Sequence, residues 1–225
     1  MSLRIIKAGI SSTLQDAGRR GFQAAGVPVS GAMDLDSMRL ANVLCGNDPG
    51  TVVLETTLHG AEWLAEEEQL IAFSGAGATL LINNQPAPYN KAIRVRACSL
   101  LSLKPSPVGC RSYLAVAGGF KSNMDLKSAS TYKPALFGGY QGRALKAGDL
   151  LEWNPERSSL SERIFSVIHQ EWQIVRHHHY YFQGKSIAFA SLKRCLSQIV
   201  QYTLPCYSAY LHQRRGYIHY LSRWQ

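Results

Sequence analysis

Residues 15–36 read QDAGRRGFQAAGVPVSGAMDLD, and this stretch sets both the fold and the chemistry expected of the 225-residue chain. Its glycines allow positive φ angles and close approach of the backbone to a ligand. They are Gly18, Gly21, Gly26 and Gly31. Charged residues of both signs lie in it, among them Asp16, Arg19, Arg20 and Asp34. An arginine binds a carboxylate or carbonate through two parallel hydrogen bonds, and a nearby aspartate orients it or accepts a proton. The loop predicts an anion site or, alternatively, a long turn closed by its own salt bridges.

Outward from this loop, as far as Trp153, short segments rich in branched and aromatic residues alternate with Gly, Pro, Asn and Asp turns. They predict strands over residues 3–7, 51–58, 69–75, 78–84, 92–97, 99–103, 111–119 and 149–153. Many short strands with turns between them favour an antiparallel barrel or sandwich. One helix is predicted over 35–45, with Asp34 as its N-cap and Gly46 as its C-terminal cap.

Two further glycine-rich stretches are candidates for an anion or oxyanion site, because backbone N–H groups at such turns bind anions. GCRSYLAVAGGFKS, residues 109–122, contributes Gly118 and Gly119 after a strand. FGGYQGRALKAGDLL, residues 137–151, contributes Gly138, Gly139 and Arg143, and SASTY before it offers the hydroxyls of Ser128, Ser130, Thr131 and Tyr132. The alternative for each glycine pair is an ordinary tight turn.

Three other motifs carry no assigned chemistry. SGAGATL, residues 74–80, has Leu80 where a dinucleotide-binding loop needs its third glycine, and no βαβ pattern surrounds it. His177, His178 and His179 are adjacent, so their side chains diverge, and no metal site is expected. The five cysteines are widely spaced and form no CxxC motif, which is typical of small buried apolar residues.

Composition and charge restrict the partners and the compartment. The N-terminus lacks the apolar run of a signal peptide, and no apolar segment reaches the roughly 20 residues that a bilayer span requires. A cytoplasmic protein without membrane contact is therefore expected. The formal charge of +9 belongs to the end of the chain, because seven basic and no acidic residues follow Trp172. This basic tail, interleaved with tyrosines, raises nucleic-acid binding as an alternative, which we rank below an incidental origin.

The order and spacing of the motifs carry a resemblance to a known family. QDAGRRGFQAAGVPVSGAMD, LANVLCGNDPG, VLE, FSGAGA, GCRSYLAVAGGF and SASTY with FGGYQGRALKAGD resemble, block by block, the biotin-dependent carboxyltransferase A/B family. That family includes the C-type subunit of bacterial 5-oxoprolinase, allophanate hydrolase subunit 2 and urea amidolyase, and the Kip-type antagonists. The resemblance covers about residues 5–153.

The resemblance implies a mostly β fold, a cyclophilin-like antiparallel β-barrel subdomain with one short helix, over residues 1–155. It also implies catalytic roles for Asp16, Arg19, Asp34 and Arg111, and no metal. Substrate binding is implied for Gly31, Gly118, Gly119, Ser128, Thr131, Gly138, Gly139 and Arg143.

The chain departs from the family pattern at two places. The family reads Gly-Ser before the hydroxyl block, whereas Lys127 precedes Ser128 here, so the backbone is less free. After residue 156 we find none of the blocks of the family's second subdomain. Residues 156–225 are expected to be an atypical basic tail, helical or disordered, that adds no catalytic residue.

Three functions follow from the resemblance. The first is a component like the C-type subunit of an ATP-dependent 5-oxoprolinase complex with A and B-type partner subunits, impaired in this chain and not active alone. The second is carboxyl transfer from carboxybiotin to urea or a related amide; with no Met-Lys-Met site in the chain, biotin would arrive on a partner. The third is a non-catalytic binding module of the Kip antagonist type. No covalently bound cofactor is expected, and the substrate would be a small amide or lactam.

Overall fold

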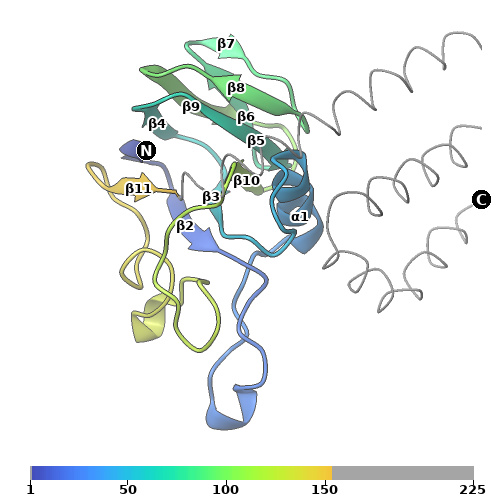
Figure 1. Cartoon of the computed structure of the whole chain (residues 1–225), viewed down its shortest axis with the longest axis vertical. Helices are drawn as coiled ribbons and strands as arrows, with labels where there is room; N and C mark the ends of the chain where they lie inside the picture. The colour runs from blue at the N-terminus through green and yellow to red at the C-terminus, as the bar shows by residue number, and fades with distance from the viewer. Residues whose placement is uncertain (1, 154–225) are drawn as a thin grey trace, which may run out of the picture. The chain divides into compact units, whose positions relative to one another are not determined.

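The computed structural model describes residues 2–153, which form two β-sheets with one α-helix and two short 3-10 helices (Figure 1). In chain order the elements are β1 (Ser2–Ala8), β2 (Ser11–Gln15), η1 (Gln23–Ala25), α1 (Leu35–Leu44), β3 (Val53–Thr57), β4 (Ala61–Ala65), β5 (Gln69–Gly75), β6 (Ala78–Ile82), β7 (Gln85–Pro86), β8 (Ala92–Val95), β9 (Ser99–Pro105), β10 (Arg111–Val116), η2 (Lys133–Ala135) and β11 (Leu150–Glu152).

Every paired strand runs antiparallel to its neighbour. One sheet has the strand order β11-β1-β4-β9-β6-β7, and the other has the order β2-β3-β10-β5-β8. The predicted mostly β, antiparallel fold with one α-helix is therefore confirmed. The strands form two separate sheets, and the expected barrel therefore consists of two sheets that share one hydrophobic core.

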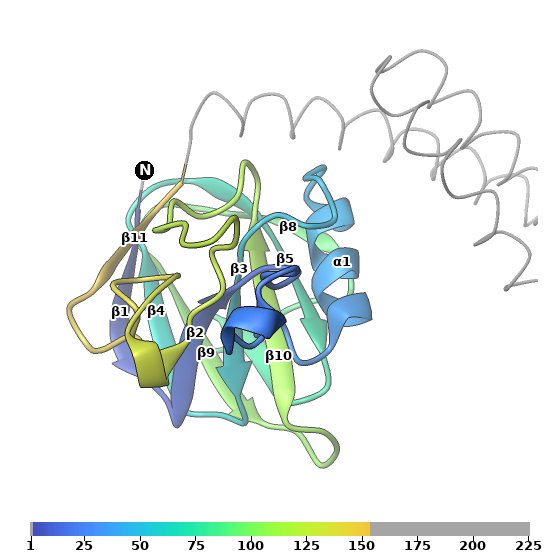
Figure 2. The same ribbon diagram turned by 90° about the horizontal axis from the view of Figure 1, so that it is seen from below.

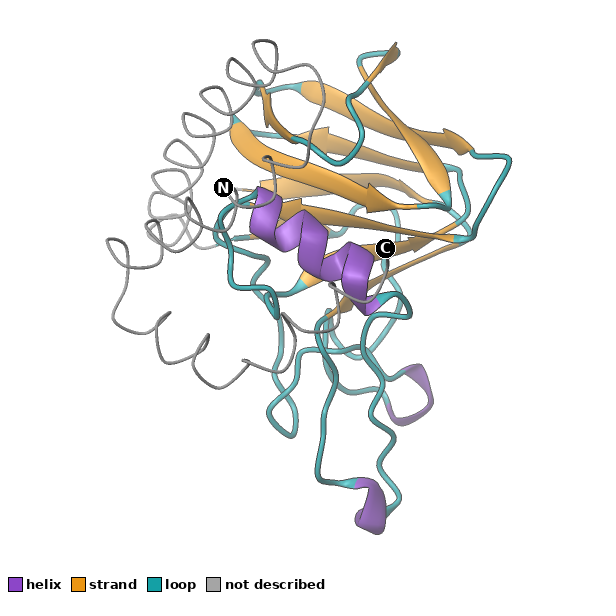
Figure 3. Ribbon diagram, turned by 90° about the vertical axis from the view of Figure 1, so that its right-hand side faces the viewer, coloured by secondary structure: helices purple, strands orange, loops and turns teal. Residues whose placement is uncertain are grey.

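Strand alternation explains how β5 and β10 are buried on both sides. Successive side chains of a strand point to opposite faces. On β5, Phe73 joins the large core that draws on both sheets, whereas Ala72 joins a second cluster under α1. On β10, Leu114 joins the large core and Tyr113 joins the cluster under α1. Figure 3 shows α1 lying across this sheet, which places the helix as a cover on its outer face.

Helix α1 begins at Leu35 as the sequence predicts and ends at Leu44, one residue before the predicted end, with Cys45 as its C-cap. The Asp34 side chain accepts hydrogen bonds from the N–H groups of Asp36 and Ser37, and Gly46 follows the helix with φ +73°. Met38 and Cys45 are fully buried on the side that faces the sheet. Burial raises the pKa of the Cys45 thiol, so this cysteine stays protonated and acts as an apolar core residue, as predicted. Cys98 and Cys110 are exposed, so the predicted burial is wrong for these two cysteines.

All eight predicted strands have a counterpart, but β2, β4 and β7 were not predicted. The sequence of β2, SSTLQ, is polar, and that of β4, AEWLA, contains good helix formers. β7 is two residues long and includes Pro86. These strands form because the neighbouring ladders offer them partners, which overrides local propensity.

The predicted boundary near residue 155 stays a prediction, since residues 154–225 lie outside the described part. The helices expected in the tail and the histidines at 177–179 lie outside it as well. Within residues 2–153, no helix is both long and apolar enough to cross a membrane.

Candidate functional site

The loop that follows β2 leaves the sheets and returns to α1, and its outgoing and returning halves, the two arms of the loop, cross and contact each other. The Arg19 N–H donates to the Val29 carbonyl at 2.7 Å. Gly18 and Gly31 have φ angles of +87° and +94°, and a Cβ atom on Gly31 would lie 2.9 Å from the Gly18 nitrogen. Both positions therefore require glycine so that the arms can touch. Figure 1 shows the loop, with η1 at its tip, standing off from the sheets.

A second long segment, residues 117–149, leaves the same end of the sheets, and Figure 2 looks onto that end. Asp16 joins the two segments. Its carboxylate, 8% exposed, accepts hydrogen bonds from the Gly18 N–H at 2.8 Å, the Ser128 hydroxyl at 2.7 Å and the Ala129 N–H at 2.6 Å. The Ser130 hydroxyl donates to it too. Three of these donors bond to Oδ1 and one, the Ala129 N–H, bonds to Oδ2. Asp16 is therefore a brace between the two segments.

Arg19 lies beneath the second segment and is only 1% exposed. One terminal nitrogen, Nη2, donates to the Ser130 carbonyl, and the guanidinium carbon lies 4.7 Å from the centre of the Phe137 ring. Nε and Nη1 have no hydrogen-bond partner among residues 2–153. A buried charge with unmade hydrogen bonds is costly. Arg19 therefore presents two donors to an acceptor that the described part of the chain does not supply.

Gly138 lies against Arg19 and Gly139 against Thr131, so neither position has room for a side chain. With φ +73°, a Cβ atom on Gly138 would clash with the Ser130 carbonyl oxygen and lie 2.7 Å from Nη2 of Arg19. A Cβ atom on Gly139 would clash with Oγ1 of Thr131. Only glycine at these two positions lets the backbone cover the guanidinium so closely.

Asp34 and Arg111 belong to a different cluster. The Asp34 N–H donates to the Tyr113 hydroxyl at 2.7 Å, and that hydroxyl donates to Glu55 at 3.0 Å. Glu55 also accepts from the Met33 N–H at 2.8 Å, and its other oxygen lies 3.5 Å from Nε of Arg111 in an ion pair without hydrogen-bond geometry. The cluster fastens the end of the loop and the start of α1 onto β3 and β10.

The pKa shifts in this cluster follow from the same contacts. Partial burial raises the pKa of Asp34, but hydrogen bonds from the Ser37 side chain and from the N–H groups of Ser37 and Asp36 outweigh it, so the net pKa is below the usual range. Burial raises the pKa of Tyr113, and the neighbouring Glu55 carboxylate raises it further. Asp34 is therefore charged and Tyr113 neutral, and both are used in structural bonds.

Gly118 and Gly119 form a tight turn away from Arg19, which is the alternative that the sequence left open. The Gly118 N–H donates to the Asn47 side-chain oxygen at 2.8 Å. A Cβ atom on Gly119 would clash with Cγ2 of Thr51. The pair thus packs against the connection between α1 and β3.

Arg143 is committed to Asp149. Its two terminal nitrogens donate to the two Asp149 oxygens at 2.7 and 2.8 Å. The hydrogen bond raises the pKa of Arg143 and lowers that of Asp149. Arg143 therefore has a structural partner where the sequence predicted substrate.

The structure thus divides the predicted site residues. Those brought together around Arg19 are Asp16, Gly31, Ser128, Thr131, Gly138 and Gly139. Those placed elsewhere are Asp34, Arg111, Gly118, Gly119 and Arg143. Their catalytic and binding roles stay predictions in both cases. Among residues 2–153, no three His, Cys, Asp or Glu side chains converge as metal ligands.

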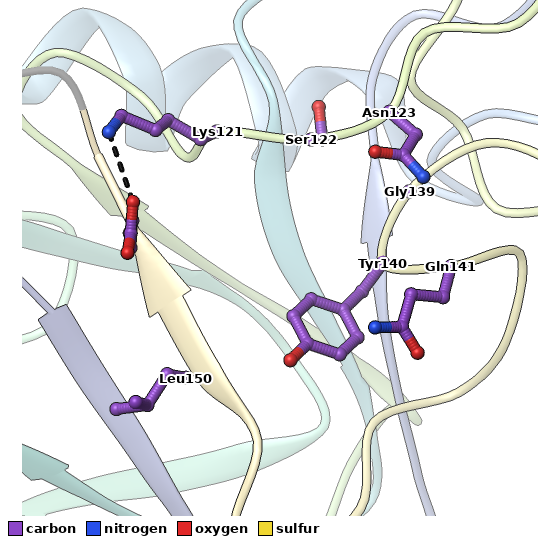
Figure 4. Close-up of a pocket in the computed structure, with 8 residues that line it drawn as sticks. Lys121, Ser122, Asn123, Gly139, Tyr140, Gln141 and Leu150 are labelled. Carbon is purple, nitrogen blue, oxygen red and sulfur yellow. Dashed lines mark hydrogen bonds and ion pairs between the residues drawn. The ribbon is translucent and has the colours of Figure 1, made fainter.

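A surface hollow of about 300 Å³ is lined in part by Gly139, which also packs on Thr131 of the Arg19 cluster. Figure 4 shows Asn123, Tyr140 and Gln141 on one side of the hollow and Lys121 on the other. The lining residues are Lys121, Ser122, Asn123, Gly139, Tyr140, Gln141, Leu150 and Glu152.

Sequence reasoning missed several residues of both clusters. Glu55 was detectable as an acid in the apolar run of β3, and Tyr113 as a hydroxyl within a strand that is otherwise apolar at its centre. Phe137 and the amides of Asn123 and Gln141 gave no signal beyond lying in glycine-rich stretches. Their importance depends on which segments the fold brings together.

The fold and the cluster define a class of protein: a mostly β domain in which two glycine-rich segments enclose an arginine suited to a carboxylate or similar anion. Comparison with known proteins narrows the class. The family model "Carboxyltransferase domain, subdomain A and B" matches residues 25–191. The chain belongs to this carboxyltransferase-domain family.

Three relatives illustrate the similarity. The urea amidolyase of Lachancea kluyveri is 41% identical over 162 residues, which is 71% of this chain and 9% of the relative. The C-type subunit of 5-oxoprolinase from Escherichia coli K12 is 39% identical over 149 residues, or 66% of this chain and 48% of the relative. The crystal structure of the K. lactis urea amidolyase superposes with a TM-score of 0.67 at 39% identity, covering 70% of this chain and 10% of that one. The chain thus spans about half of the bacterial relative and about a tenth of the amidolyases.

Proposed function

We propose that this chain acts like the C-type subunit of an ATP-dependent complex that opens 5-oxoproline to glutamate. The observation that carries the proposal is the buried Arg19 guanidinium, whose Nε and Nη1 lack acceptors among residues 2–153. 5-Oxoproline carries a carboxylate, and opening its lactam ring passes through an oxyanion. Either group is an acceptor for paired arginine N–H groups.

Burial of Arg19 supports a role within a complex. Phe137 stacks on the guanidinium, and Gly138 lies against Nη2, so an anion reaches the free nitrogens only when this segment moves. Assembly with A and B-type partner subunits would supply that movement. ATP would be used by the complex, and this chain would bring no covalently bound cofactor.

The carboxylates of the described part favour a binding and positioning role over proton transfer by this chain. Asp16 is held by four hydrogen bonds that join the two loop segments, and Asp34 serves as a helix N-cap. A proton acceptor for water would then come from a partner subunit. The same observation also supports the alternative function, a non-catalytic binding module, which the test below distinguishes.

The test is to co-purify the full chain with A and B-type 5-oxoprolinase subunits and to measure ATP-dependent glutamate formation. We expect activity that falls by about 100-fold in R19Q, because a charged donor pair is lost from the anion site. The matched control R39Q removes a half-buried arginine whose ion pair within residues 2–153 is with the exposed Asp36, and it should leave the rate unchanged. No glutamate from active, full-length partners would overturn the proposal. Tight binding of the B-type subunit without turnover would instead support the binding module.

Carboxyl transfer to urea is the second candidate, and similarity to urea amidolyases favours it. Carboxybiotin carries a carboxylate and urea carries amide groups, so the two together offer Arg19 the same kinds of acceptor as 5-oxoproline does. The assay replaces 5-oxoproline with urea and supplies a biotin-carrying partner, a biotin carboxylase that charges it, ATP and bicarbonate. Formation of a carboxylated urea, sensitive to R19Q, would select this reaction over the first.

A further inference from the structure

The ring of Phe137 covers one face of the Arg19 guanidinium, with 4.7 Å from the guanidinium carbon to the ring centre. Arg19 is 1% exposed, whereas Phe137 is half-buried. The ring therefore lies between the guanidinium and the solvent. Its position decides whether an anion reaches Nε and Nη1, the two nitrogens of Arg19 that lack an acceptor among residues 2–153.

Phe137 ends a six-residue loop, residues 132–137, that closes on itself. Tyr132 and Phe137 exchange backbone hydrogen bonds of 2.9 and 3.4 Å, and their ring centres lie 5.4 Å apart. Between them, η2 contains no buried residue, and Leu136 is 71% exposed. Figure 1 shows η2, in yellow-green, at the periphery of the domain. A segment with few buried contacts and exposed backbone hydrogen bonds opens locally at low cost in free energy.

The backbone on both sides of this loop is held by other bonds. Before it, the N–H and the hydroxyl of Thr131 both donate to the Leu14 carbonyl, at 3.0 and 2.8 Å. After it, the Gly138 N–H donates to the Asp125 carboxylate at 2.7 Å. Glycine at this second junction also permits a wide range of backbone angles. The loop can therefore open without moving its neighbours.

The closed state combines favourable and unfavourable contacts. Stacking of Phe137 on Arg19 stabilises it. Against this, two donors of Arg19 stay buried without an acceptor, and Leu136 is held at φ +56°, which is strained for a residue with a side chain. Opening hydrates the guanidinium and relaxes Leu136. An anion that binds only the open state then shifts the population toward it.

We propose that the loop of residues 132–137 is a gate that closes the Arg19 site in the isolated chain and opens as one unit, carrying Phe137 off the guanidinium. Thr131 and Gly138 stay in place, so Nε and Nη1 are uncovered while Nη2 keeps its backbone acceptor. The inference rests on the proposed function for the identity of the anion. A partner subunit that binds the open loop would thereby switch the site on.

Hydrogen exchange of the full, 15N-labelled chain, followed by NMR, tests the gate at single N–H groups. The Nε–H of Arg19 and the backbone N–H groups of Tyr132 and Phe137 should share one opening constant, equal within about twofold. The N–H groups of Thr131 and Gly138, outside the gate, should open at least about tenfold less often.

Two variants should shift this opening in opposite directions. F137A removes the cover and should raise the opening constant at the Arg19 Nε–H at least about tenfold. L136G relieves the strained φ angle of the closed loop and should lower it about threefold. K133A, which changes an exposed side chain of the same loop, should match the wild type. Unchanged exchange of the β5 amides in all variants excludes a fold defect.

The gate is overturned if the Arg19 Nε–H opens no more often than the β5 amides. It is also overturned if Thr131 and Gly138 open together with the loop, or if F137A and L136G leave the opening constant as in K133A.

Added 5-oxoproline separates this inference from the proposed function. It should slow exchange at the Arg19 Nε–H, which it binds, and speed exchange at the Phe137 N–H, because it holds the gate open. A loop that opens as described, without an effect of 5-oxoproline and without glutamate formation by the complex, would remove the proposed function alone. Glutamate formation with an Arg19 exchange that F137A does not change would remove the gate alone.

Discussion

The carboxylate of Asp16 accepts the hydroxyl hydrogen of Ser128 at 2.7 Å, across 112 positions of sequence. This bond, with those from Ala129 and Ser130, joins the loop after β2 to the segment that covers Arg19. The candidate site therefore exists only when both segments are in place.

Replacing Asp16 by asparagine should lower the free energy of unfolding by about 3 kcal/mol. An amide NH2 group would face donors where the carboxylate accepts, and charge-assisted bonds would be lost. D48N is the matched control, because Asp48 is exposed and its side chain accepts from the Gly50 N–H; its cost should stay below about 1 kcal/mol. Urea denaturation measures both, and equal costs would show that Asp16 is not a brace.

Replacing Arg19 by methionine should leave the stability of the chain within about 1 kcal/mol of the wild type or raise it, because an incompletely paired buried charge is removed. R143M, which leaves Asp149 without its partner, should cost about 2 kcal/mol. Thermal unfolding compares the two variants. A loss in R19M as large as in R143M would show that Arg19 has a structural role.

Lys127→Gly should raise the free energy of unfolding by about 1 kcal/mol. Leu126 and Lys127 have φ angles of +54° and +62° and form a two-residue turn, across which Asp125 and Ser128 exchange backbone hydrogen bonds of 2.9 and 3.2 Å. Such turns favour glycine, and a left-handed lysine is strained. K133G serves as control: Lys133 has no positive φ, so glycine there should not stabilise. The change is measured by chemical denaturation, and a destabilised K127G would contradict this explanation.

The Arg143–Asp149 pair should make stability fall in acid. The pKa of Asp149 is lowered in the folded state by its hydrogen bonds with Arg143, so its contribution is complete above the unfolded pKa of about 3.9 and disappears as pH falls through the folded value. The wild type should exceed D149N in unfolding free energy at pH 6, and the difference should shrink toward pH 3. A difference that does not depend on pH would exclude this ion pair as its source.

Tyr113→Phe should cost about 1–2 kcal/mol, because both the Asp34 N–H and the Glu55 carboxylate lose a buried partner. Y132F is the control, since its ring contacts Phe137 and its hydroxyl has no hydrogen bond within residues 2–153. Denaturation midpoints of the two variants test the difference. A Y113F protein as stable as Y132F would remove the proposed fastening of the loop onto β10.

The amino-acid sequence by itself determined the features whose causes are local. Asp34 caps a helix whose first N–H groups are two and three residues away. The positive φ angles of Gly18 and Gly31 are likewise a property of the glycine-rich loop itself. Most strands were predicted, since alternation and turn residues lie within a few positions. The family followed from the order of short motifs along the chain.

Only the tertiary structure decided which of these motifs form a site. It placed Arg19 under Gly138, and it assigned Arg111 to Glu55 instead. It also gave AEWLA a strand's place between β1 and β9. The physical reason is that hydrogen-bond satisfaction depends on neighbours far apart in sequence. No local pattern tells that Asp16 accepts hydrogen bonds from donors 112 to 114 residues away, or that two nitrogens of Arg19 are left without an acceptor among residues 2–153.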